Sequence, residues 1–244
     1  MKKALKFTLC MAPLSIAAGI TVALYEIGTG IASQMQMPEG KLVSLITLQT
    51  VVYALISAFL GYLLSDATGL LRPFGFQKKP LVSTLAIGSA AGAVMFVLEH
   101  LLFSRLIPGV ATFYETYPFS LAYLSSEVFY GGVVEELLMR WFLMSLLVWI
   151  LMKLTRRKKE AVPSWCFLAA NLVVAVLFAL GHLPATKVLF GTITPVIFVR
   201  CMLLNGGLGF VFGLLYRKWG IQYAMVAHAL VHVVCDALLF IVVK

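Results

Sequence analysis

Six ionisable side chains lie in stretches of this chain that are otherwise apolar. They are Glu135, Glu136, Arg140, His182, His228 and His232. A charge at the centre of a bilayer costs about 2.5–3.5 kcal/mol even on the most lenient scale, so residues of this kind usually face a cavity and carry function. The set therefore predicts a polar, chemically active site buried among membrane helices.

The first stretch holds a carboxylate pair next to a guanidinium. Glu136 and Arg140 are four residues apart, so on a helix they share one face and can form an ion pair. Glu135 points about 100° away from its neighbour, which leaves its carboxylate free to act as a general base on water. A purely structural Glu–Arg pair, with Glu135 at a water-facing helix end, would explain the same spacing.

The histidines supply groups that can hold a metal ion or a water molecule. His228 and His232 lie on one stripe of the last helix, with Asp236 one turn further on, so two imidazoles can address one metal or one water. Ala229 stands where a zincin motif needs its Glu. A seam of hydrogen bonds between helices is the alternative for this pair, whereas two His on one helix cannot sandwich a haem iron. His182 is expected to end its helix just before Pro184.

Arg200 is a further charge within an apolar stretch. We expect it to end a short or re-entrant helix and to extend its guanidinium to the interface. An anion clamp, for instance for a substrate carboxylate, is the alternative.

Composition defines the elements that must position these residues. The 244 residues are 61% hydrophobic and 12% charged, compared with roughly 45–50% apolar residues in soluble domains. Windows long enough to cross about 30 Å of hydrocarbon lie at 5–26, 42–65, 82–106, 119–152, 164–182 and 221–243, with a less regular region at 190–216. We predict an all-α polytopic bundle of seven to eight transmembrane helices, forming a single membrane domain over residues 1–244.

The net charge of +9 reflects topology and does not indicate a nucleic-acid partner. Lys and Arg gather at span ends, and with seven spans the positive-inside rule gives a cytoplasmic N-terminus and an external C-terminus. The first apolar run exceeds the 7–15 residues usual in a signal peptide, so we expect an uncleaved span. The four Cys are scattered singly and are expected to be packing residues.

The motifs also occur in a recognisable order. Glu-Glu-x-x-x-Arg is followed by Phe-x-x-x-His, a Gly-spaced helix, and His-x-x-x-His. This order resembles the CPBP family of intramembrane metalloproteases, also called the Abi family, which comprises type II CAAX prenyl proteases and bacteriocin-processing proteins. The resemblance covers residues 119–244 and implies an integral membrane endopeptidase, expected in a bacterial plasma membrane.

The resemblance implies a role for each matching residue. Glu135 falls on the catalytic Glu, and Glu136 and Arg140 complete its motif. His182 and His228 would hold the attacking water or a divalent metal such as zinc, together with Glu135. The last motif ends in His232 where the family has Asn or Asp; His232 would stabilise the oxyanion, and Asp236 could be a substitute acid one turn away. The substrate would be a peptide or a membrane protein.

Two other classes of function fit the same residues. A non-catalytic immunity or scaffold protein would retain the fold without turnover. A proton-coupled transporter would use the same Glu and His as a proton relay.

Overall fold

Seven long apolar helices make up the fold. The computed structural model describes residues 1–28, 36–116 and 120–243, and no strand occurs in these ranges. The seven helices that are long and apolar enough to cross a membrane are Lys2–Gly28, Glu39–Thr68, Lys78–Leu106, Leu121–Leu154, Ser164–Phe190, Pro195–Trp219 and Ile221–Val242. The predicted helical membrane bundle is confirmed. The irregular region around 190–216 is one of the spans, and the nine-residue α6 (Pro108–Thr116) is too short to be an eighth.

Several spans are built from consecutive helical segments. The first two are α1 (Lys2–Gly28) and α3 (Glu39–Thr68), and the third is α4 (Lys78–Val97) with η1 (Leu98–Phe103) and α5 (Ser104–Leu106). The fourth consists of α7 (Leu121–Ser126), the π-helical segments η2 (Glu127–Glu135) and η3 (Leu137–Met144), and α8 (Ser145–Leu154). The last three are α9 (Ser164–Phe190), then α10 (Pro195–Cys201) with the π-helical η5 (Met202–Gly207) and α11 (Leu208–Trp219), and finally α12 (Ile221–Val243).

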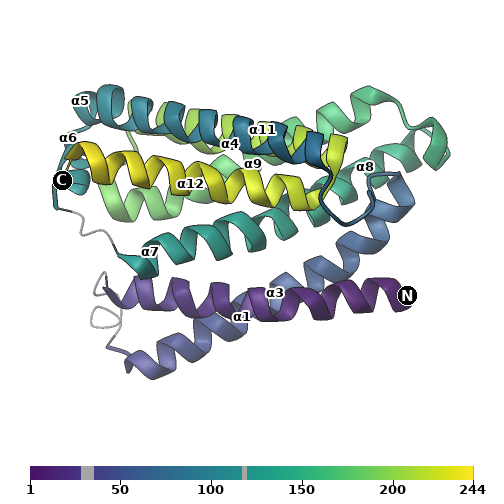
Figure 1. Cartoon of the computed structure of the whole chain (residues 1–244), viewed down its shortest axis with the longest axis horizontal. Coiled ribbons are helices and arrows are strands. Elements are labelled where there is room, and N and C mark those ends of the chain that lie inside the picture. Colours follow the sequence, from purple (N-terminus) through teal and green to yellow (C-terminus); the bar gives the residue numbers. More distant parts are fainter. Residues whose placement is uncertain (29–35, 117–119, 244) are drawn as a thin grey trace.

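The fourth span lies between two groups of helices (Figure 1). On one side are α1 and α3, which pack on each other; on the other are α4, α9, α11 and α12. η2 packs against both α1 and α12, and η3 against α3 and α9. The fourth span is therefore the element through which the two groups touch.

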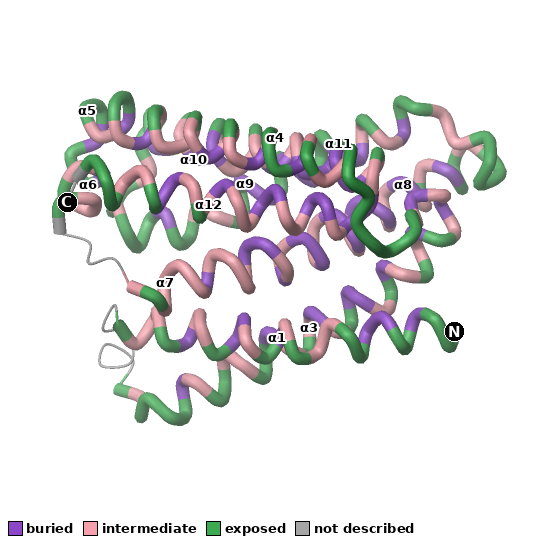
Figure 2. Tube along the Cα trace, in the orientation of Figure 1, coloured by how far each residue is buried: buried purple, intermediate pink, exposed green. Residues whose placement is uncertain are grey.

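Burial follows this arrangement. Buried positions lie along the fourth span and on the faces turned toward it, whereas the outer faces are exposed (Figure 2). Val134, Leu137, Trp141 and Met144 on the fourth span are at most 1% exposed. The outward faces carry Leu, Ile, Val and Phe, as expected of surfaces that meet lipid tails.

Glycines allow the close approaches that the site needs. A Cβ at Gly132 would lie 2.8 Å from the Cβ of Ala229, so the absence of a side chain brings η2 directly against α12. A Cβ at Gly209 would lie 2.5 Å from Nη2 of Arg140, so this glycine makes room for the guanidinium. Small residues serve the same purpose in many membrane bundles.

Pro184 does not end its helix, which corrects the expectation for His182. α9 runs through Pro184 to Phe190, and His182 therefore lies inside a helix. Membrane helices tolerate an internal proline because side chains and neighbouring helices satisfy the backbone groups that it frees.

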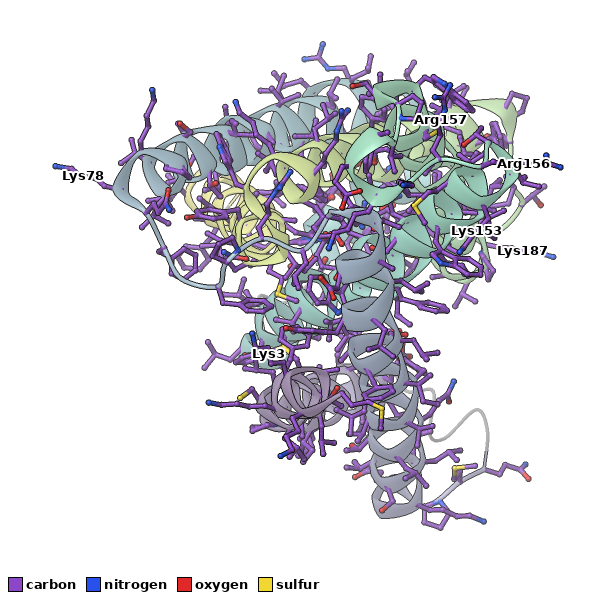
Figure 3. The ribbon with its side chains drawn as sticks, turned by 90° about the vertical axis from the view of Figure 1, so that its right-hand side faces the viewer. Lys3, Lys78, Lys153, Arg156, Arg157 and Lys187 are labelled. Carbon is purple, nitrogen blue, oxygen red and sulfur yellow. The ribbon has the colours of Figure 1, made fainter. Side chains whose placement is uncertain are left out.

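Basic residues gather at the end of the bundle that holds the N-terminus. They come from the start of α1, the connection between α3 and α4, the connection between α8 and α9, and the junction of α11 with α12 (Figure 1). Figure 3 views the molecule from this end, with Lys3, Lys78, Lys153, Arg156 and Arg157 spread around it.

Candidate functional site

A cavity of about 550 Å³ lies between α1, the α7–η2 segment, α9 and α12. Its walls include four of the predicted residues, Glu135, His182, His228 and His232. Tyr25, Glu26 and Tyr123 also line it, from the last turn of α1 and the first turn of α7. These turns lie at the end of the bundle opposite the N-terminus (Figure 1), so the cavity extends toward that end.

Glu135 faces two imidazoles across the cavity. Its Oε1 lies 3.8 Å from Nε2 of His182, and its Oε2 lies 3.9 Å from Nε2 of His228. The Nδ1–H of His182 donates to the carbonyl of Phe178 at 2.8 Å, which directs Nε2 toward Glu135. The structure thus brings together three groups from three different spans at distances that one water molecule can bridge.

Glu136 binds two partners inside the protein. Its Oε1 accepts hydrogen bonds from Nη1 of Arg140 and from Nδ1 of His228, each at 2.9 Å. Glu136 and Arg140 are fully buried, so the predicted ion pair is present. The guanidinium also lies 4.5 Å from the ring centroid of Phe178, where a cation is attracted to the ring face.

The π-helical geometry of η2 sets which carboxylates face α12. Glu127 and Glu136 are nine residues apart, which in an α-helix of 3.6 residues per turn is two and a half turns, so they would point to opposite sides. In a π-helix, whose i→i+5 bonds give roughly 4.4 residues per turn, the same spacing is about two turns. Glu127 and Glu136 therefore both point at α12, one to His232 and the other to His228.

His232 does not lie beside Glu136 or Arg140 but pairs with Glu127. Its Nδ1 is 3.0 Å from Oε1 of Glu127, and its ring stacks on that of His228 with centroids 5.3 Å apart. Asp236 contacts the same Glu127 carboxylate and is not part of the cavity wall.

Arg200 corrects a further expectation. It neither extends to the interface nor stands ready for an anion, because its Nε donates to Oε2 of Glu99 at 2.9 Å and its Nη2 binds the second oxygen. Glu99 is fully buried. A bidentate ion pair satisfies both groups and joins η1 to α10, which is the reason Arg200 can remain inside the bundle.

Comparison of the sequence with models of protein families identifies the family to which it is related. Residues 117–234, about half of the chain, match the family model described as type II CAAX prenyl endopeptidase Rce1-like. Residues 117–234 form a domain of this Rce1-like family. The match confirms the family predicted from the motifs; among curated proteins and among solved structures, nothing matches. Membership indicates an integral membrane protein with protease activity that acts on a peptide substrate.

Sequence reasoning missed two acidic residues of this Rce1-like chain, Glu99 and Glu127. Both lie within predicted apolar windows, 82–106 and 119–152. The rule that singled out Glu135, a charge where hydrocarbon should expel it, applied equally to them. Glu127 lines the cavity, and Glu99 neutralises Arg200.

The donors do not fit a metal centre in their present arrangement. Two ligands of one tetrahedral zinc, each bonded at about 2.0–2.1 Å, lie about 3.4 Å apart, whereas the Glu135 oxygens lie 3.8 and 3.9 Å from the two imidazoles. Within the ranges that the structure describes, no group of three His, Cys, Asp or Glu converges to hold an ion. We therefore derive no chemical step through a metal.

Substitution of Arg140 tests the buried ion pair. We expect Arg140→Met to lower the free energy of unfolding by about 3–5 kcal/mol, because it leaves the Glu136 carboxylate with an uncompensated charge. Adding Glu136→Gln should recover part of this loss by removing the charge. Thermal unfolding of the purified protein in detergent measures both effects.

The matched control is the exposed pair of Lys159 and Asp66, whose atoms are 3.1 Å apart. Asp66→Asn should change the stability by less than about 1 kcal/mol, as solvent screens such pairs. A double variant no more stable than Arg140→Met would contradict the account of the pair.

Proposed function

We propose that this protein is an intramembrane endopeptidase in which Glu135 activates the attacking water. The observation that supports this most directly is the position of the Glu135 carboxylate, with one oxygen toward His182 and the other toward His228. A carboxylate and two imidazoles around one water supply a general base and groups that position the nucleophile.

In the proposed mechanism, Glu135 takes a proton from the water as the water oxygen attacks the peptide carbonyl carbon. The water donates a hydrogen bond through its second hydrogen to Nε2 of His182 or His228, and the Nδ1–H groups of both rings are held in turn by the Phe178 carbonyl and by Glu136. The carbonyl oxygen becomes an oxyanion, which His232 stabilises as an imidazolium, with one N–H toward Glu127 and the other donating a hydrogen bond from Nε2. Glu135 then gives its proton to the leaving nitrogen as the C–N bond breaks.

The bundle also supplies the environment that hydrolysis in a membrane requires. The reacting groups lie in a cavity whose walls include Leu138, Met139 and Leu177. Such a wall excludes bulk water, so each hydrogen bond to the developing charge is stronger than it would be in solution. The substrate is a peptide or a segment of a membrane protein that can enter from the lipid or from the open end.

Glu135→Gln is the central test. The change is nearly isosteric and removes the base, so we expect cleavage of a peptide substrate to fall by at least about 10²-fold, while expression and thermal stability stay unchanged. The measurement is a proteolysis assay in reconstituted vesicles, with a fluorogenic peptide library as substrate.

The control for this test is Glu160→Gln, which changes an exposed acid on the α8–α9 connection and should leave activity intact. Cellular function that persisted in Glu135→Gln would refute the protease and favour a scaffold. Proteins trapped by Glu135→Gln but not by the parent, identified by mass spectrometry, would supply the substrate. A transporter would instead show pH-dependent uptake into vesicles.

The requirement for a divalent metal stays a prediction to be decided by analysis of the purified protein. From the spacing of the donors around Glu135, we expect activity to persist after dialysis against a chelator and metal content to lie well below one ion per chain. One zinc per chain that disappears in His182→Ala would overturn this and assign His182 and His228 as ligands.

We further propose that the N-terminus is cytoplasmic and that the membrane is a bacterial plasma membrane. The basic residues gathered at the N-terminal end support this orientation through the positive-inside rule. The cavity then opens on the outer side, because the turns of α1 and α7 that line it lie at the opposite end.

Cysteine labelling tests this orientation. In a chain without its native Cys, a cysteine at Ala185 on the cavity wall should react with a membrane-impermeant maleimide in intact cells. A cysteine at Lys158 in the basic cluster should react only after the cells are permeabilised. The opposite pattern would reverse the orientation.

A further inference from the structure

The Rce1-like chain places an imidazole, His232, at the position where the motif usually has Asn or Asp. An imidazole has two different nitrogens, and rotation of the ring exchanges the edge that faces the cavity. A histidine at this position therefore needs a second group that fixes which nitrogen points at the reacting peptide.

Glu127 is placed to be that group. Its Oε1 is 3.0 Å from Nδ1 of His232, and the two side chains are 13% and 20% exposed. With Nδ1 facing the carboxylate, Nε2 faces the cavity next to Gly131. A Cβ at Gly131 would lie 3.6 Å from Nε2 of His232 and also 3.6 Å from Nε2 of His228. Both imidazoles thus present the same nitrogen to one region of the cavity.

The Glu127–His232 pair joins the same kinds of atoms as its neighbour, although only the Glu136–His228 contact has the geometry of a hydrogen bond. In each case a carboxylate of the fourth span faces Nδ1 of a histidine on α12, at 2.9 Å for Glu136 with His228 and at 3.0 Å for Glu127 with His232. The two rings are nearly parallel, with 28° between their planes. A carboxylate that orients a catalytic imidazole through Nδ1 is a familiar arrangement in hydrolases.

Glu127 is itself held in place. Tyr123, one turn earlier on α7, and Asp236 on α12 also contact its carboxylate. The carboxylate therefore has fixed neighbours on both helices that it joins.

We propose that Glu127 is a positioning residue that holds His232 with Nε2 toward the scissile peptide, and that this pair replaces the Asn or Asp of the usual motif. An Asn side chain would present its amide donor without help, so Glu127 is needed only when a histidine occupies position 232. The proposal rests on the proposed endopeptidase activity, in which His232 contacts the oxyanion.

A double-mutant cycle tests the proposal. Glu127→Gln should lower kcat about tenfold or more with little change in KM, since a misplaced oxyanion donor affects the transition state and not substrate binding. His232→Asn removes the imidazole that Glu127 would position, and the kcat of this variant is the reference for the second arm of the cycle. In that background, adding Glu127→Gln should change kcat less than about twofold, because the group that it positions is gone.

Equal losses of kcat from Glu127→Gln in both backgrounds would overturn the proposal and indicate a merely structural role. Full activity of Glu127→Gln in the parent chain would overturn it as well. Thermal unfolding of each variant identifies any loss that comes from misfolding.

A second measurement does not depend on catalysis. With ¹⁵N-labelled histidine, Glu127→Gln should shift the Nδ1 resonance of His232 and leave that of His228 unchanged. An unmoved His232 resonance would overturn the proposal even if His232→Asn were inactive. A shifted resonance in a protein without protease activity would show that the pair is real and that the proposed function has failed.

Discussion

The hydrogen bonds of the buried Glu136 carboxylate are the interaction on which the site depends. One oxygen binds both Arg140 and His228 at 2.9 Å, so the charge that makes Arg140 tolerable inside the bundle also orients a catalytic imidazole. The pair is costly to bury and costly to break, since either partner alone would leave an uncompensated charge. Gly209 leaves space for the Arg140 guanidinium, and the face of the Phe178 ring attracts its positive charge.

The second constraint is the wide turn of the fourth span. A π-helical stretch is rare compared with an α-helix and occurs frequently at functional sites. Here it brings Glu127 and Glu136 to one side, where they meet His232 and His228, while Glu135 turns toward His182. An ordinary α-helix with the same sequence would direct Glu127 away from α12 and leave His232 without its partner.

These two constraints explain what the sequence could and could not predict. The membrane spans were predictable from the length of each apolar stretch of sequence. The Glu136–Arg140 ion pair was predictable because the two residues are four positions apart on one helix. Glu127 was missed because a period of 3.6 places it opposite Glu136, and only the π-helix reverses this. Arg200 was misread because its partner, Glu99, lies 101 residues away, and no local pattern reveals a contact between distant spans.

The partners of the carboxylates inside the bundle also distinguish Glu135, the proposed general base, from the other acidic residues. Glu99 is bound by Arg200, Glu127 lies 3.0 Å from His232, and Glu136 is bound by Arg140. Among these four acids of the described spans, Glu135 is the one whose nearest nitrogen partners, the two imidazoles, lie 3.8 and 3.9 Å from its oxygens. A carboxylate held in a tight ion pair is a poor proton acceptor, whereas one separated from two imidazoles by the width of a water molecule can bind and deprotonate that water. The bundle thus neutralises three acids for structure and leaves the fourth for chemistry.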